Sequence, residues 1–213
     1  MAGDPLTELS GHWQADEPLR RFLAEVTPSP GRVVTEPVLG NTQHSELFDY
    51  WQSLPRQAGI PAAADFNPTR ILRCLPNISI LSLDAPDIIS FRLTGTALAD
   101  RIGLEPRGEN MLSFMEEGYR AKCSRDMFEA VLRPCGWQAH HRTRYSSGRT
   151  VYVKSSYLPL RAPDGKPPRL VSIHTPEDNP TYEPATGKPH FAGEVLEIVW
   201  IDTGHGAPGQ ASR

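Results

Sequence analysis

The densest group of side chains that could do chemistry is a run of positive charge between residues 138 and 160, which contains no aspartate or glutamate. Alternate residues of an extended strand share one face, so several of these cations would lie together. Such a surface could bind an anionic ligand or nucleic acid. We name this set the basic face, and its members are His140, Arg142, Arg144, Arg149 and Lys154.

The basic face is also consistent with two arrangements that involve no ligand. One face of an antiparallel sheet is often solvated, where clustered cations need no partner. Alternatively, the acidic N-terminal part of the chain could cover it, because Glu46 and Asp49 share a predicted helix with Trp51. The stacking aromatics expected of a nucleic-acid platform are few, which argues against nucleic acid as a partner.

A second candidate site is apolar. In the stretch 88–94, alternation puts Phe91 and Leu93 on one face, directed towards the helical segment that follows. Two methionines among aromatic side chains form an adaptable lining, which either closes into filled core or admits a small apolar ligand. Nothing in the sequence decides between the two. The predicted pocket consists of Phe91, Leu93, Leu98, Met111, Phe114, Met127 and Phe128.

The sequence gives little support to an enzyme. It contains no G-x-S-x-G, H-E-x-x-H or G-x-x-x-x-G-K motif. His140 and His141 are adjacent, so on a strand they point to opposite faces and do not easily share a metal. Cys123 falls among helical core positions, where a thiol is usually inert. A small enzyme on a curved α+β cone fold remains an alternative, but it requires an ionisable pair that the predicted pocket lacks.

The elements that must position these residues follow from periodicity and turn residues. Amphipathic helices are predicted over 18–26, with Asp16 as N-cap, and over 45–54. Strands are predicted over 78–84, 88–94, 138–145, 150–160 and 169–174, and helical segments over 96–102, near 111 and over 119–133. This order predicts an α+β fold with a five-stranded antiparallel sheet and helices on one face.

The order of elements resembles that of PAS sensory domains, and short motifs extend the resemblance. The chain carries Tyr50-Trp51, Leu54-Pro55, Asp65-Phe66-Asn67-Pro68 and Leu75-Pro76 ahead of a strand that ends in Phe91-Arg92-Leu93-Thr94-Gly95-Thr96. These are similar to a divergent PAS family common in alphaproteobacteria, over roughly 44–175. The resemblance implies that any ligand would lie between the sheet and the helices.

The same resemblance bears on cofactors. Some PAS domains bind haem through a histidine on the helical side, but residues 96–133 contain no histidine. A flavin-reactive cysteine in the family sense would need a motif that this chain does not show. We therefore expect no cofactor.

Charge and composition divide the chain into three parts. Residues 1–66 hold 4 basic and 9 acidic side chains, 67–175 hold 16 and 10, and 176–213 hold 2 and 6. We expect an N-terminal arm over 1–43, a PAS-like domain over 44–175, and a C-terminal part over 176–213 with a Pro-rich loop, a strand at 194–202 and a disordered tail. Because 194–202 is apolar on both faces, the parent sheet or a second chain must cover it.

Together these observations predict a stand-alone sensory or interaction domain of bacterial signalling. It would act by binding a small ligand, by forming a homodimer, or by binding an unknown signalling protein. The alternative is an adaptor that binds an anionic ligand or nucleic acid through the basic face. The chain has no apolar run of about 18 residues and no signal peptide, so we expect a cytoplasmic protein without membrane contact.

Overall fold

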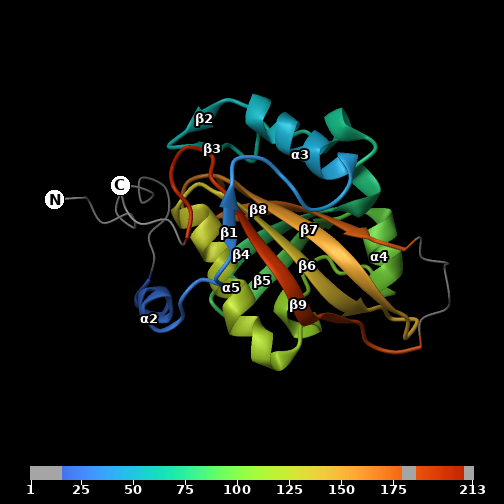
Figure 1. Cartoon of the computed structure of the whole chain (residues 1–213). Coiled ribbons are helices and arrows are strands. Elements are labelled where there is room, and N and C mark those ends of the chain that lie inside the picture. The colour runs from blue at the N-terminus through green and yellow to red at the C-terminus, as the bar shows by residue number, and fades with distance from the viewer. Residues whose placement is uncertain (1–15, 179–185, 209–213) are drawn as a thin grey trace.

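The computed structural model describes residues 16–178 and 186–208 of the chain and is built around one large sheet (Figure 1). In the described residues this sheet has seven strands in the order β1-β9-β6-β7-β8-β4-β5. The strands are β1 (Arg32–Val34), β4 (Ile78–Ala85), β5 (Ile88–Thr94), β6 (Gly136–Arg144), β7 (Thr150–Leu160), β8 (Arg169–Pro176) and β9 (His190–Ile201).

The five strands predicted for a PAS-like sheet all form, and they pair antiparallel with their neighbours from β5 to β6. The turn predicted between β6 and β7 contains Gly148, whose φ of 86° lies in the left-handed region that favours glycine. The α+β class and the five-stranded core of the prediction are therefore confirmed.

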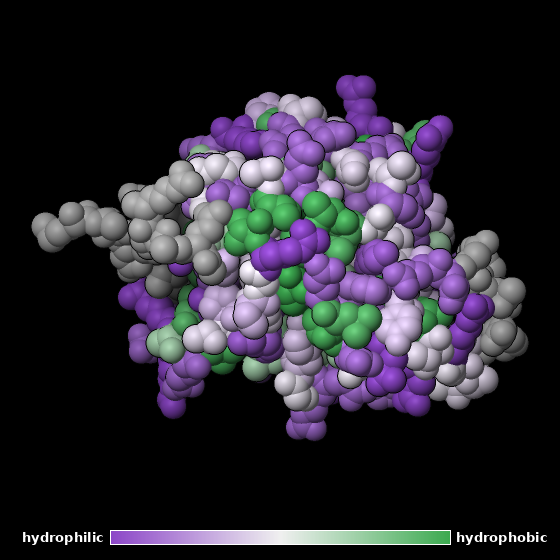
Figure 2. Space-filling view, viewed as in Figure 1, coloured by the Kyte–Doolittle hydropathy of each residue, from purple (hydrophilic) through white to green (hydrophobic). Residues whose placement is uncertain are grey.

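The C-terminal strand joins the same sheet. β9 pairs antiparallel with β6, with Trp137 opposite Trp200, and begins at His190 rather than at 194. On its other side β9 pairs in parallel with β1, a short strand that the sequence pattern did not predict. Figure 2 shows hydrophobic side chains interleaved with hydrophilic ones over this region. Both edges of the apolar strand are thus paired within the parent sheet, and its residues 198–201 are buried, whereas Leu196 is 47% exposed.

One face of the sheet, here called the inner face, packs against the central helical segments. They are α4 (Thr96–Ile102), η4 (Met111–Phe114) and α5 (Glu117–Leu132). Along α5, Cys123, Met127 and Phe128 are buried. Helix α2 (Glu17–Glu25) adds to this core, since the ring of Phe22 meets Phe128 edge-on at 6.5 Å. The predicted cap of α2 forms: the Asp16 carboxylate accepts a hydrogen bond from the Leu19 N–H at 3.0 Å.

The opposite, outer face is partly covered by α3 (Thr42–Ser53). The stripe Leu47, Phe48 and Trp51 packs on β7 and β8, and Trp51 Nε1 donates to the Pro159 carbonyl at 2.7 Å. The segment predicted as extended over 55–70 forms a small hairpin and the start of a 3-10 turn. The short elements here are β2 (Arg56–Gln57), β3 (Ile60–Pro61), η2 (Pro68–Ile71) and η3 (Leu75–Asn77).

The chain after β9 is ordered further than predicted. The Asp202 carboxylate accepts hydrogen bonds from the N–H groups of Gly204 and Gly206, and Ala207 is fully buried. The expected disorder is therefore wrong for residues 203–208. Residues 209–213 of the predicted tail, 179–185 of the predicted Pro-rich loop and 1–15 of the predicted N-terminal arm lie outside the described residues.

Candidate functional site

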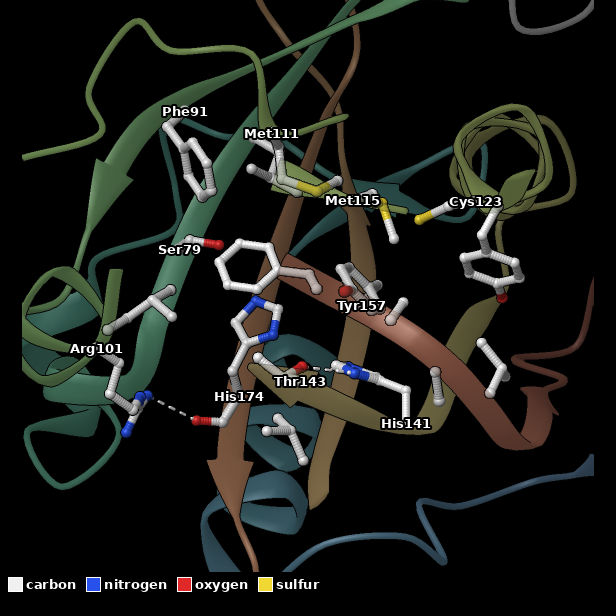
Figure 3. A pocket seen from close by; sticks show the side chains of 18 of the residues that line it. Ser79, Phe91, Arg101, Met111, Met115, Cys123, His141, Thr143, Tyr157 and His174 are labelled. Carbon is white, nitrogen blue, oxygen red and sulfur yellow. Dashed lines mark hydrogen bonds between the residues drawn. The ribbon is translucent and has the colours of Figure 1, made fainter. Parts of the chain in front are cut away.

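A cavity of about 40 Å³ lies between the inner face of the sheet and the helical segments (Figure 3). One water needs about 10–15 Å³ of such space, so the cavity has room for about three waters. Its apolar lining consists of Leu81, Phe91, Leu98, Met111, Met115, Cys123, Trp137, Ala139, Val153, Phe191, Ala192 and Val195. Its polar lining consists of Ser79, Arg101, Tyr119, His141, Thr143, Tyr145, Tyr157 and His174.

The cavity coincides in part with the predicted pocket. Phe91, Leu98 and Met111 line it. The other predicted core residues, Phe114, Met127 and Phe128, are buried in the same core without lining it.

The prediction for Leu93 is wrong. Leu81 pairs with Phe91 but Ile80 pairs with Leu93, so Arg92 is an extra residue between the two pairs. This β-bulge breaks the alternation of faces. As a result Leu93 packs against the outer core that contains Ile78 and Val171.

The polar side of the cavity belongs to a continuous chain of hydrogen bonds across four neighbouring strands, β6, β7, β8 and β4. Thr143 Oγ1 lies 3.0 Å from His141 Nδ1, and His141 Nε2 lies 3.0 Å from Ser155 Oγ. Ser155 Oγ lies 2.9 Å from His174 Nδ1, and His174 Nε2 lies 3.0 Å from Ser172 Oγ. Ser172 Oγ lies 2.6 Å from Ser79 Oγ. We name this set the Ser–His row; its members are Thr143, His141, Ser155, His174, Ser172 and Ser79.

Burial keeps the imidazoles of the row uncharged. It lowers the pKa of His141 to about 4, with a smaller effect from His140 in the same direction. The pKa of His174 is also lowered well below its usual range, mainly by burial. Burial likewise raises the pKa of the Cys123 thiol well above its usual range, which keeps the sulfur protonated. Each neutral imidazole then offers one hydrogen-bond donor and one acceptor.

The cavity wall therefore contains two ionisable side chains, His141 and His174, that the predicted pocket lacks. His141 and His174 come from strands β6 and β8, whereas the residues of the predicted pocket come from one strand and the helices. The signal that could have found His141 is the alternation along 137–145, because the residue next to an outward His140 must point inward.

The basic face lies on the outer side of the sheet, and acidic residues compensate part of it. The Glu177 carboxylate lies 2.9 Å from Lys154 Nζ and 3.2 Å from His140 Nε2. Glu194 lies 3.7 Å from Arg142 Nε. Arg144 is exposed opposite Thr150, and Arg149 lies half-buried at the end of the turn before β7. Among the described ion pairs, the acidic partners of the basic face are these two glutamates, and not Glu46 or Asp49 of the predicted N-terminal helix.

Within residues 16–178 and 186–208, no cluster of three or more histidine, cysteine, aspartate or glutamate side chains could hold a metal ion. Nor is any helix of these ranges long and apolar enough to cross a membrane.

The sequence of the central part matches a family model described as a PAS domain over residues 40–174, which is more than half of the chain. The chain belongs to the PAS domain family. The match runs from just before α3 into β8, so β9 lies outside it. Phe191, Ala192 and Val195 of β9 nevertheless complete the cavity wall of this PAS domain.

Solved structures of PAS-related proteins are similar at a low level. VqmA bound to DPO is 14% identical with a TM-score of 0.40, and the match covers 52% of this chain and 56% of VqmA. A structure of the Vibrio cholerae VqmA dimer gives the same TM-score of 0.40 and 14% identity, over 52% of each chain. The PAS domain of an HTR-like protein from Haloarcula marismortui is 13% identical at a TM-score of 0.38, over 51% of this chain and 89% of that one.

An RNA-binding light-oxygen-voltage receptor is 18% identical at a TM-score of 0.40, over 81% of this chain and 47% of the receptor. Likenesses at this level carry no argument about function. This PAS chain spans about half the length of VqmA, and among curated proteins none matches it. The expectation that it does not bind nucleic acid stays a prediction.

Proposed function

We propose that this chain is a sensory PAS domain that binds a small molecule in the cavity on the inner face of the sheet. The proposal is supported by the opposite character of the cavity's two sides. In Figure 3, Phe91, Met111 and Met115 lie on one side, and His141, Thr143 and His174 on the other. Such a combination is typical of ligand sites, where apolar surface supplies affinity and a few polar groups fix orientation.

The size of the cavity limits the ligand. A volume of about 40 Å³ admits only a few heavy atoms in the present arrangement. Methionine side chains adapt easily because they are unbranched and have three rotatable bonds, so a larger ligand would enter by moving Met111 and Met115.

Binding is favoured over catalysis by the position of Ser155. Its hydroxyl lies at hydrogen-bond distance from two imidazoles, an arrangement that could activate a nucleophile. However, Ser155 is fully buried and is not part of the cavity wall, so a ligand in the cavity does not reach it. Homodimer formation and binding to a signalling protein belong to this proposal as the ways in which ligand binding would be read out.

Methyl NMR of protein labelled in its methionines tests the proposal. Met111 and Met115 line the cavity, whereas Met127 is buried in the same core without lining it and serves as an internal control. A library of small molecules should contain compounds that shift the Met111 and Met115 signals and leave Met127 unchanged.

A cavity-filling variant is the matched control. Ala139→Val adds two methyl groups at the cavity wall and should abolish the response to compounds. If no compound shifts the two cavity methionines, or if Ala139→Val responds like the wild type, the proposed binding site is wrong.

A further inference from the structure

The wall of the inner cavity follows strand β6 along its length. Alternate residues of an extended strand share one face, and a strand rises about 3.3 Å per residue. The inward residues of β6, together with the residue that follows the strand, all line the cavity, and the row spans about 26 Å on this rise. They are Trp137, Ala139, His141, Thr143 and Tyr145. The wall is therefore elongated, with Trp137 at one end of this row and Tyr145 at the other.

The end of the wall at Tyr145 carries a positive charge. Arg101 of α4 belongs to the wall, and its Cζ lies 5.9 Å from the centre of the Tyr145 ring. The guanidinium donates to the Asn77 side chain at 2.9 Å and to the His174 carbonyl at 3.1 Å, and these bonds fix its position. Figure 3 places Arg101 and Cys123 at opposite sides of the cavity. Because a guanidinium stays ionised in proteins, this end is cationic.

Arg101 also determines the sign of the charge of the whole wall. Among the residues that the structure describes, no aspartate or glutamate lines the cavity. Burial lowers the pKa of His141 and His174, so both imidazoles are uncharged at neutral pH. Burial raises the pKa of the wall's three tyrosines and of Cys123, which keeps these groups protonated. The positive sign of the wall favours an anionic ligand over a cationic one.

The Tyr145 hydroxyl is a hydrogen-bond donor at the same end. Tyr145 is 5% exposed, and within the described part of the chain its hydroxyl has no hydrogen-bond partner. Burial raises the pKa of Tyr145 to about 12, so the hydroxyl keeps its hydrogen at neutral pH. A buried polar group without a partner costs free energy, which a ligand that accepts a hydrogen bond from it would recover. The ligand should therefore present an acceptor at this end.

The burial of Arg101 lowers the cost of binding a charged ligand. Arg101 is 7% exposed, so its own desolvation takes place when the protein folds. An anionic ligand then loses only its own hydration, and it gains a charge-assisted hydrogen bond from a donor that is already in position. A neutral ligand of the same shape forms weaker hydrogen bonds, and a cationic ligand is repelled.

We propose that the cavity takes a small aliphatic carboxylate, whose two oxygens bind between Arg101 and the Tyr145 hydroxyl and whose hydrocarbon part extends towards Met111 and Met115. A carboxylate fits because it carries a single charge and is an acceptor at both oxygens. The inference rests on the proposed function for the presence of a ligand. It adds the charge of the ligand and its orientation in the cavity.

Three planar probes of nearly equal shape test the ligand class by methyl NMR of the full chain at neutral pH. They are propionate, propionamide and propionamidine, which are anionic, neutral and cationic. Propionate should shift the Met111 and Met115 signals, leave Met127 unchanged, and bind at least about tenfold more tightly than propionamide. Propionamidine should shift none of them. Because the basic face lies on the other side of the sheet, propionate bound there would leave all three signals unchanged.

Two variants test the two donors. Tyr145→Phe removes the hydroxyl and keeps the ring beside Arg101, so it should weaken propionate binding about tenfold. Its matched control is Tyr152→Phe on the outer face, where Tyr152 is 42% exposed, and this variant should bind propionate like the wild type. Arg101→Gln removes the charge and should abolish the preference for propionate over propionamide. Because Arg101→Gln also loses the bonds to Asn77 and His174, Tyr145→Phe decides the question if that variant does not fold.

Four results would each overturn the inference. They are no response to propionate, equal affinity for propionate and propionamide, a response to propionamidine as strong as that to propionate, and unchanged propionate binding in Tyr145→Phe. If neutral compounds then still shift Met111 and Met115, the proposed function stands although the inference has failed.

Discussion

Histidine is buried on both faces of the sheet, and the two sites differ in what lies above them. On the outer face, His44 of α3 has Ser156 Oγ at 2.7 Å and Thr175 Oγ1 at 2.8 Å. On the inner face, His141 and His174 bond to hydroxyls in the same manner. The outer site is covered by a filled core, whereas the inner site borders a cavity. The outer histidine therefore fastens a helix to the sheet, and the inner pair remains available to a ligand.

Acid should destabilise the protein through the histidines of both faces. Burial lowers the pKa of His44 and His141 from 6.5 to about 4. Between these values the unfolded chain binds protons that the folded chain does not, so the free energy of unfolding falls as the pH decreases through this window. At about 1.4 kcal/mol per pH unit, each of these two groups accounts for a loss of about 3 kcal/mol. Urea unfolding at a series of pH values between 7 and 4 measures the effect.

His44→Asn separates the contributions of the two faces. It removes the outer titration and keeps both inner histidines, so the fall in stability across this pH window should become about 3 kcal/mol smaller. An unchanged pH dependence would show that burial does not lower the pKa of His44 on the outer face as it lowers that of His141 on the inner face.

Truncation of large side chains should distinguish the filled core from the hollow one. Trp51 is fully buried on the outer face and donates from Nε1 to Pro159, so Trp51→Ala should cost about 4 kcal/mol of unfolding free energy. Met115 borders the cavity, where fewer contacts are lost, and Met115→Ala should cost about 2 kcal/mol. Urea unfolding at neutral pH measures both. Equal losses would contradict the view that only the outer core is filled.

Small enlargements should have opposite signs on the two faces. Ala139→Val places its methyl groups in the cavity and should be neutral or stabilise by up to about 1 kcal/mol. A Cβ added at Gly136 would lie 3.0 Å from Ile201 Cβ and 3.1 Å from Leu158 Cδ2, so Gly136→Ala should destabilise by about 1 kcal/mol. Thermal unfolding of both variants measures the difference. Destabilisation by Ala139→Val would indicate that the inner space is not accessible to side chains.

The two faces of the sheet differ in how much of their structure could be predicted from the sequence. The strands and helices followed from periodicity and turn residues because those signals are local, and Leu47, Phe48 and Trp51 lie on the face that their spacing predicts. The cavity was predicted only in part. Arg92 inserts a bulge that no local pattern marks, and this moves Leu93 to the other core.

The Ser–His row was missed for a different reason. Its members come from β4, β6, β7 and β8, and only the order of strands in the sheet brings them together. Serine and threonine in strands are common, so hydroxyls at these positions carry no sequence signal of their own. Strand β1 was also missed, because its Arg32–Val34 is too short for a periodic pattern and its pairing with β9 spans most of the chain.

The smallest effect on stability is expected for the basic residues, which lie on the part of the outer face beside α3. Lys154 and Glu177 have side chains 30% and 37% exposed, and a hydrogen bond from Lys154 lowers the pKa of Glu177. Exposed ion pairs contribute little because solvent screens them, so Glu177→Gln should change the unfolding free energy by less than about 0.5 kcal/mol. A loss well above 1 kcal/mol in urea unfolding would mean that this part of the outer face is organised around its charges. The sheet would then carry three kinds of surface: the cavity on the inner face, the filled core on the outer face, and a cluster of charges on the basic face that contributes to stability.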